Sequence, residues 1–179
     1  MMDWRWTEVD TLENQGEWNK AKSLLIAKWK QNPNDLKTVI RLGFFCWYVL
    51  TEEGPLEIKD VDFDELETML REVTDFGLVN FMTNEDFLWC FGYMISLFPY
   101  YFGDYEYWEE KGISMLKRAY KLCPDESVYK YSYLGSFPNS EEKLKDEFQQ
   151  VHAVLKDRFQ GNGVLSEYFK DVWNCWHES

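Results

Sequence analysis

Residues 139–163, NSEEKLKDEFQQVHAVLKDRFQGNG, decide the fold class. Large apolar residues recur in this stretch at steps of three and four, and they are Leu144, Phe148, Val151, Leu155 and Phe159. This spacing places all of them on one face of a helix. Asn139 with Glu142 three residues later is the pattern of a capping box, and the Gly-Asn-Gly at 161–163 is a typical helix stop. The stretch therefore predicts one amphipathic helix that begins close to Asn139.

The same periodicity recurs elsewhere in the chain. Asp62 with Glu65 predicts another helix start, which is followed by an apolar stripe at Leu66, Met69, Leu70 and Val73. A last helix is predicted after residue 163. Its apolar face contains Leu165, Phe169, Val172, Trp173 and Trp176. Because the chain has no convincing run of alternating β-branched residues, the sequence predicts an all-α fold.

The longest apolar stretch, residues 87–102, resembles a membrane span only at first sight. Ser96 and Pro99 interrupt it. Acidic residues, Asp86 and Asp104, flank it. A membrane-spanning helix needs about 20 apolar residues. The stretch is therefore predicted to be a buried helix, and no contact with a membrane is expected.

Size and composition indicate one globular domain over residues 1–179. Apolar residues make up 45% of the chain, and the nine Trp, eleven Tyr and thirteen Phe are unusually many. A chain of this length buries roughly two-thirds of its unfolded surface. A stable core is therefore expected without disulfides or metal.

The cysteines and the first residues favour the cytoplasm. Cys46, Cys90, Cys123 and Cys175 show no Cys-x-x-Cys spacing. Free cysteine inside an aromatic, helical stretch behaves as a small buried hydrophobe, and disulfide frameworks belong to short secreted chains. The first six residues also lack the apolar core of a signal peptide.

The charge of the chain is concentrated in one segment. The formal net charge is −13, and residues 51–86 contribute −10, from twelve acids against Lys59 and Arg71. Such a field repels nucleic acid and anionic membranes and attracts cationic partners. The alternative is a solvated acidic face that only keeps the protein soluble.

A bulky residue followed by glycine recurs three times, at Leu42-Gly43, Phe91-Gly92 and Leu134-Gly135. Each pair lies in a helix-like stretch, where glycine costs about 1 kcal/mol relative to alanine. Glycine at such positions usually marks the close approach of another helix. Gly43 and Gly92 are therefore predicted to lie at helix crossings.

The helices that precede the first and the third of these pairs share a second pattern. Gly16, Ala21, Leu25 and Pro33 form one series, and Gly112, Leu116, Ala119 and Pro124 form another. With these two patterns, residues 4–137 resemble the tetratricopeptide repeat, a 34-residue helix–turn–helix unit. The glycines lie 49 and 43 residues apart, so insertions are expected in 51–63 and 99–111. The resemblance implies stacked antiparallel helical hairpins with a C-terminal capping helix; a generic helical bundle is the alternative.

The resemblance also implies a concave groove lined by the first helix of each hairpin. Carried over to this chain, the groove side contains Lys37, Ile40, Phe44, Trp47, Tyr48, Asp86, Trp89, Tyr93 and Leu97. Trp47, Tyr48, Trp89 and Tyr93 are the candidates for anchoring a partner segment. The alternative is that the same rings pack within the array.

A second candidate surface combines acids with aromatic residues. In residues 100–110, YYFGDYEYWEE, the two kinds interleave, as suits contact with a basic, arginine-rich protein. Phe102 and Trp108 can instead belong to the core. The predicted partner-binding residues here are Asp104, Tyr105, Glu106 and Tyr107, together with the acids Glu57, Asp60, Asp62, Asp64, Glu65 and Glu67.

Enzymatic and metal-dependent activities are not predicted. The acidic string from Asp60 to Asp64 is not an EF-hand, because Glu65 replaces the glycine of its turn and Arg71 replaces its last glutamate. The two histidines are His152 and His177, and Cys175-x-His177 would supply only two of the three or four ligands a metal needs. No nucleophile elbow, phosphate loop or cofactor motif is present in the sequence.

These observations predict a protein that binds and masks a basic protein. In size and charge the chain is similar to bacterial immunity proteins, which implies neutralisation of a cationic, nuclease-type toxin. The alternative is a tetratricopeptide-type chaperone or adaptor that holds an extended peptide in its groove.

Overall fold

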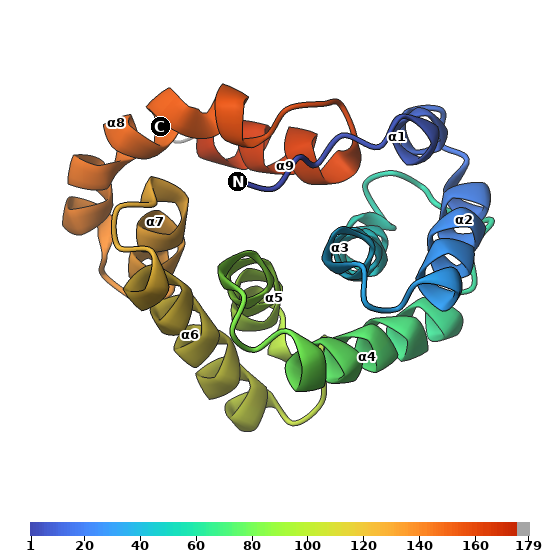
Figure 1. The fold of residues 1–179 in the computed structure, drawn as a ribbon, viewed down its shortest axis with the longest axis horizontal. Helices are drawn as coiled ribbons and strands as arrows, with labels where there is room; N and C mark the ends of the chain where they lie inside the picture. The colour runs from blue at the N-terminus through green and yellow to red at the C-terminus, as the bar shows by residue number, and fades with distance from the viewer. Residues whose placement is uncertain (175–179) are drawn as a thin grey trace.

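The computed structural model describes residues 1–174, and every regular element in that range is helical (Figure 1). In chain order the elements are α1 (Thr7–Asn14), α2 (Trp18–Gln31), α3 (Leu36–Glu52), α4 (Phe63–Asn80), α5 (Glu85–Leu97), the short 3-10 helix η1 (Pro99–Tyr101), α6 (Tyr105–Leu122), α7 (Ser127–Gly135), α8 (Glu141–Arg158) and α9 (Val164–Asn174). No strand occurs in this part of the chain, so the all-α prediction is confirmed.

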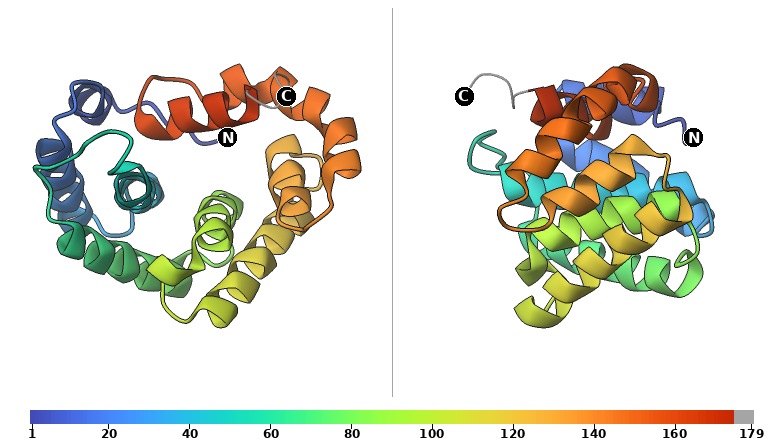
Figure 2. Two further views of the ribbon diagram at one scale, coloured as in Figure 1. Left: turned by 180° about the vertical axis from the view of Figure 1, so that it is seen from behind. Right: turned by 90° about the vertical axis from the view of Figure 1, so that its left-hand side faces the viewer.

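The helices form a curved array with two layers (Figures 1 and 2). Helices α2, α4, α6 and α8 follow one another around the outside, whereas α3, α5 and α7 lie on the inside. The hairpins α3–α4, α5–α6 and α7–α8 stand side by side in chain order. One continuous hydrophobic core runs through the array, from Trp4 to Trp173.

Side-chain caps set the start of several helices. Asp62 accepts a hydrogen bond from the backbone N–H of Glu65 at 3.1 Å, so the predicted start of α4 is confirmed. Asn84 and Asp104 cap α5 and α6 in the same way. Each cap satisfies one of the backbone N–H groups that the first turn of a helix leaves free.

Helix α8 begins two residues after Asn139, close to the predicted position, but the predicted capping box is wrong. Ser140 occupies the N-cap position without a side-chain cap bond. Asn139 itself lies in the left-handed region, with φ of 59°, a conformation that asparagine tolerates better than most residues. Asn139 is therefore a residue of the turn before α8 and does not cap the helix. The helix ends at Arg158, before the predicted stop at 161–163.

The glycines of the repeated pairs differ in what they contact. A Cβ at Gly92 would lie 3.0 Å from the Leu116 backbone nitrogen and 3.1 Å from the Gly112 carbonyl oxygen, so the predicted helix crossing is confirmed between α5 and α6. At Gly43 the close neighbour is the ring of Phe91. At Gly135 the nearest atom, Cδ2 of Leu144, is 3.8 Å away. Two of the three pairs therefore mark close helix contacts.

Helix α9 does more than cover the end of the array. It contacts α8, but it also packs against α3 and α1, and Figure 1 shows it crossing the opening between the two ends of the curve. The N-terminal segment before α1 runs beside it. The inner face of the array is therefore covered by both ends of the described chain.

Within residues 1–174, no helix combines the length and the apolarity that a membrane crossing requires.

Candidate functional site

The aromatic residues predicted to line an open groove are covered by helix α9. Trp47 and Trp89 are 1% and 0% exposed, and Tyr48 and Tyr93 are half-buried. The ring of Phe169 lies 4.8 Å from that of Trp89 and 5.0 Å from that of Tyr93, centre to centre. The structure therefore places Trp47 and Trp89 in the core, as the alternative interpretation of the sequence expected.

Polar contacts fix this covering in place. The hydroxyl groups of Tyr93 and Tyr168 lie 3.0 Å apart and share a hydrogen bond. From the N-terminal side, the buried ring of Trp4 packs on Trp89, with centres 6.4 Å apart. Because α9 and the N-terminal segment pack on these rings, the inner face is closed around Trp47 and Trp89, and it is open at a pocket that Tyr93 and Leu97 help to line.

A first buried ion cluster joins α1, α3 and the start of α9. Arg41 donates to Asp10 at 2.8 Å and to Glu13 at 3.2 Å, and all three side chains are buried. Glu13 also accepts the backbone N–H of Val164 at 2.9 Å. Burial raises the pKa of Glu13, and the positive charge of Arg41 partly opposes this shift. The cluster holds the entry to α9 against α1.

A second buried ion cluster centres on Arg158, which donates to Asp86 and to the hydroxyl of Tyr129. Its guanidinium lies 5.5 Å from the ring centre of Trp89 and 5.9 Å from that of Trp4. Aromatic faces attract cations, which explains how this arginine is accommodated although Nε and Nη1 have no hydrogen-bond partner.

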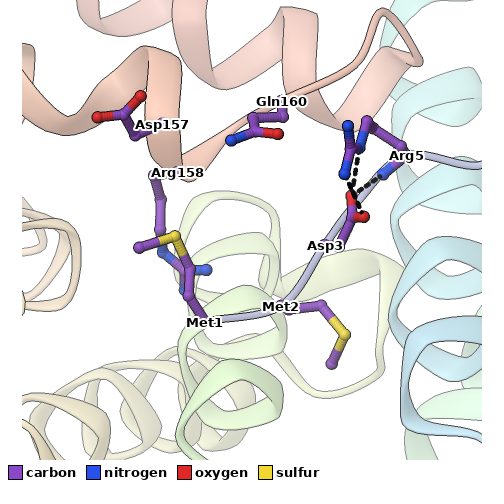
Figure 3. Close-up of a pocket in the computed structure, with 7 residues that line it drawn as sticks. All are labelled: Met1, Met2, Asp3, Arg5, Asp157, Arg158 and Gln160. Atoms are coloured by element: carbon purple, nitrogen blue, oxygen red, sulfur yellow. Dashed lines mark hydrogen bonds and ion pairs between the residues drawn. The ribbon is translucent and has the colours of Figure 1, made fainter.

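Beside Arg158 lies a pocket of about 180 Å³ under the N-terminal segment (Figure 3). Arg5 at its rim is paired with Asp3 at 2.8 Å. Arg158, the other arginine of the lining, is already paired with Asp86. Both guanidinium groups of this pocket therefore have carboxylate partners within the chain.

The second candidate surface lies open to solvent, and we call it the acidic–aromatic edge. It comprises Glu57, Asp60, Asp62, Asp64, Glu65, Glu67, Asp104, Tyr105, Glu106 and Tyr107. All of these are exposed except Glu67, which is half-buried. Figure 2 shows the loop before α4 and the start of α6 on the same side of the molecule.

Arg71 connects the two parts of this edge. Its Nη2 donates to Glu67 at 2.7 Å, and its Nε donates to the carbonyl oxygen of Tyr101 at 3.0 Å. The hydroxyl of Tyr101 in turn donates to the carbonyl of Leu50 at 3.0 Å. Burial, a hydrogen bond with Tyr100 and nearby carboxylates such as Glu67 together raise the pKa of Tyr101. The middle of α4 and the turn before α6 are thus tied together.

Some of the predicted acids already have partners inside the chain. Asp62 and Asp104 each use one oxygen to cap a helix, and Glu65 forms an ion pair with Lys22. Glu57 adopts a left-handed backbone, with φ of 50°. Within residues 1–174, the edge carboxylates that make no hydrogen bond or ion pair are therefore those of Glu57, Asp60, Asp64 and Glu106.

Sequence reasoning missed Arg71, Tyr101 and Lys22 as parts of this surface. Arg71 offered a signal, because it is one of only two bases among the twelve acids of residues 51–86. A base in such surroundings has an acidic partner close by. Lys22 offered none, since it is 43 residues away from Glu65 in the chain.

The described residues 1–174 contain no group of three or more His, Cys, Asp or Glu side chains placed to hold a metal ion. Cys46 and Cys90 are buried, as predicted, and burial raises the pKa of both thiols. Cys123 is half-buried. Cys175, Trp176 and His177, named above for a possible metal site and for the last helix, lie outside the described residues.

Comparison of the chain with protein-family models, with curated proteins and with solved structures finds no match. The resemblance to the tetratricopeptide repeat and the similarity to immunity proteins therefore stay predictions.

Proposed function

We propose that this protein binds and masks a basic protein through its acidic–aromatic edge. The observation that carries the proposal is the exposure of Tyr105 and Tyr107, at 52% and 58%, next to the carboxylates of Asp104 and Glu106. Tyrosine is enriched where proteins bind one another, and its ring face also attracts arginine. The surface thus combines two features that suit an arginine-rich partner.

The partner class that fits best is a cationic toxin domain of the nuclease type, which makes the protein an immunity protein. A nuclease carries a basic surface because it contacts phosphates. The net charge of −10 over residues 51–86 complements such a surface. A charge of this sign also argues against nucleic acid and anionic membranes as partners. The free thiols of Cys46 and Cys90 fit the reducing cytoplasm.

A groove-binding chaperone or adaptor is the second candidate, and the covered groove argues against it. To reach Trp47 and Trp89, a peptide would have to displace α9, whose Phe169 is fully buried among other rings. The acidic–aromatic edge needs no such rearrangement.

The kinetic test uses, as the partner, a purified cationic toxin domain from the same source as this chain. Changing Asp60, Asp62 and Asp64 to Asn should lower the association rate and flatten its salt dependence, because rim charges act mainly on association. Asn at position 62 preserves the cap of α4. The matched control removes three exposed acids elsewhere, with Asp146, Asp157 and Asp171 changed to Asn. Equal association rates for both triple variants at low salt would contradict the proposal.

A second measurement concerns dissociation. Tyr105→Ala should raise the dissociation rate, at a cost of about 2 kcal/mol if the ring is a central anchor. Tyr105→Phe keeps the ring and should stay close to the original rate. Equal effects of the two substitutions would show that the ring itself contributes nothing.

A further inference from the structure

A larger pocket, which we call the socket, lies at the end of α5, from which the chain runs through η1 into the acidic–aromatic edge. Its volume is about 460 Å³, within the roughly 300–1,000 Å³ of small-ligand sites. It opens where α5 and α7 end, where α8 begins and where α9 ends. Leu97 on its rim directly precedes the turn that leads through η1 to Tyr105 and Tyr107. A partner bound at the edge can therefore reach the socket.

Aromatic rings form much of the socket wall. The rings of Tyr131 and Trp173 lie 5.6 Å apart, centre to centre, at 78° to each other. Tyr93 meets Trp173 at 6.4 Å and 86°. Ring faces carry partial negative charge and attract cations within about 6 Å of the ring centre. Walls of this kind suit a flat cationic group.

Three of the four serine hydroxyls that line the socket already donate their proton inside the chain. Ser96 donates its proton to the Tyr93 carbonyl at 2.9 Å. Ser136 donates to the Tyr133 carbonyl at 2.7 Å. Ser132 likewise donates to a backbone carbonyl of its own helix, and it already accepts the indole N–H of Trp89 at 2.9 Å. Since a hydroxyl has one proton and two lone pairs, the lone pairs are what these side chains have left for a ligand.

The hydroxyl of Tyr131 lacks a hydrogen-bond partner although the residue is only 4% exposed. Burial raises the pKa of Tyr131, so the phenol stays neutral. Buried polar groups are rarely left unpaired. A ligand with hydrogen-bond donors would satisfy the Tyr131 hydroxyl as well.

The charge around the socket is negative. Glu141 is the single charged side chain among the fourteen described residues that line it. The C-terminal ends of α5 and α7, where backbone carbonyls carry partial negative charge, face the same space. The opposite, positive end of α8 is offset by Glu141 and Glu142 in its first turn.

We propose that the socket receives an arginine side chain of the basic partner. A guanidinium is flat, carries five donors and stacks on aromatic rings, which matches ring walls, acceptor hydroxyls and one carboxylate. Lysine would match the charge but not the flat shape. An apolar side chain would leave the acceptors and the Tyr131 hydroxyl without partners. This inference rests on the proposed function, since it names the group of the partner that is recognised.

The direct test uses the full chain, labelled with ¹⁵N, and the probe acetyl-Gly-Arg-Gly-amide. Saturable NMR shifts are expected at the indole N–H of Trp173, which Trp173→Phe assigns. The same peptide with citrulline keeps the shape and loses the charge, and it should bind at least about tenfold more weakly. Equal or tighter binding of the citrulline peptide, or of one with norleucine, would overturn the inference, as would the absence of shifts with arginine.

A matched pair of variants tests the carboxylate. Glu141→Gln should weaken binding of the arginine peptide about fivefold. Glu142→Gln removes the same charge from the same helical turn, but Glu142 does not line the socket, so binding should stay close to that of the original chain. Equal weakening by both substitutions would mean that general charge, and not the socket, attracts the peptide.

The socket and the proposed function can fail separately. If the arginine peptide does not bind while changing Asp60, Asp62 and Asp64 still slows association of the toxin domain, only the socket inference is overturned. If the peptide binds at Trp173 but the substitutions in the edge do not slow association of the toxin domain, the proposed function of the edge is overturned instead.

Discussion

Gly92 lies where two helix backbones are closest, and it shows how a single residue limits the array. A Cβ there would meet the backbone of α6, at the Leu116 nitrogen and the Gly112 carbonyl oxygen. Backbone atoms cannot turn away as the end of a side chain can. Any side chain at this position must therefore push α5 and α6 apart.

Gly92→Ala should lower the free energy of unfolding by about 1–3 kcal/mol, the usual cost of overpacking. Gly135→Ala is the matched control, because its nearest neighbour is 3.8 Å away. In the control, the free energy of unfolding should stay unchanged or rise by up to about 1 kcal/mol, because alanine has the higher helix propensity. Denaturation in urea compares the two, and equal stabilities would show that the α5–α6 crossing tolerates a methyl group.

Glu13 is a second residue whose environment leads to a measurable effect. One of its oxygens, Oε1, is buried without a partner, and burial raises its pKa above the ordinary value of 4.5. The folded state therefore holds this proton more tightly than the unfolded state does. Its contribution to stability is fully present below pH 4.5 and is lost as the pH rises through the raised value.

Glu13→Gln should remove that pH dependence, since glutamine does not titrate. Relative to the original chain, the variant should gain stability between pH 4 and pH 8, by about 1.4 kcal/mol for each unit of pKa shift. Urea denaturation at several pH values gives this difference. A difference that is constant across the range would show that Glu13 titrates alike in both states.

At the scale of elements, α9 joins parts of the array that are far apart in the sequence. Its Phe169 touches rings from α3 and α5, at 5.6 Å from Phe44 and 4.8 Å from Trp89. The ion cluster around Glu13 ties the first residue of the helix to α1. Helix α9 thus connects α1, α3 and α5 across the inner face.

Phe169→Ala should cost about 3–5 kcal/mol, as expected for a fully buried ring. Val79→Ala, at a position that is 83% exposed in α4, should change stability by less than about 0.5 kcal/mol. Chemical denaturation measures both. A loss below about 1 kcal/mol for Phe169→Ala would mean that α9 is loosely held, and the groove-binding adaptor would then be the better proposal.

The position of α9 also shows what the sequence can and cannot predict. Period-3.6 stripes predicted the helices around 62–73 and 141–158, because one apolar face must be buried wherever the helix packs. A stripe does not say against which element it packs, so Trp47 and Trp89 were candidates for both an open groove and a core. Local chemistry was also ambiguous at Asn139, where a cap and a left-handed turn residue have the same sequence pattern.

The two surface sites were predictable to different degrees. Composition alone indicated the acidic–aromatic edge, since acids and tyrosines are adjacent in residues 100–110. The link through Arg71 and the socket depend on three-dimensional contacts between residues 30 or more positions apart, as with Arg71 and Tyr101 or with Tyr93 and Tyr131. No sequence pattern joins such residues when the chain has no detected relatives.

At the scale of the whole molecule, positive charges inside are paired and negative charges outside are crowded. Arg41 and Arg158 are buried, and each contacts carboxylates. Most of the acids of residues 51–86 are exposed. Salt screens exposed charges strongly and buried pairs much less. The effect of salt on stability therefore reports mainly on the crowded acids.

Raising NaCl from 10 mM to 300 mM should increase the melting temperature, because screening relieves the repulsion among like charges. The variant with Glu53→Gln, Glu57→Gln and Asp60→Asn should be more stable at low salt, by about 1 kcal/mol or roughly 2–4 °C. Its melting temperature should also respond less to salt. Glu53 contributes doubly, since it lies at the C-terminal end of α3, where the helix dipole disfavours an acid.

The control for this measurement carries Asp146→Asn, Asp157→Asn and Asp171→Asn, which remove as many acids from α8 and α9. Acids are sparser there, since residues 87–179 hold fourteen acids against ten bases. Its salt response should stay close to that of the original chain. If salt lowers the melting temperature instead, surface pairs such as Arg71–Glu67 outweigh the repulsion, because screening weakens attraction as much as repulsion. The acidic edge would then be stabilised by its own ion pairs, and less of its charge would be free to attract a basic partner.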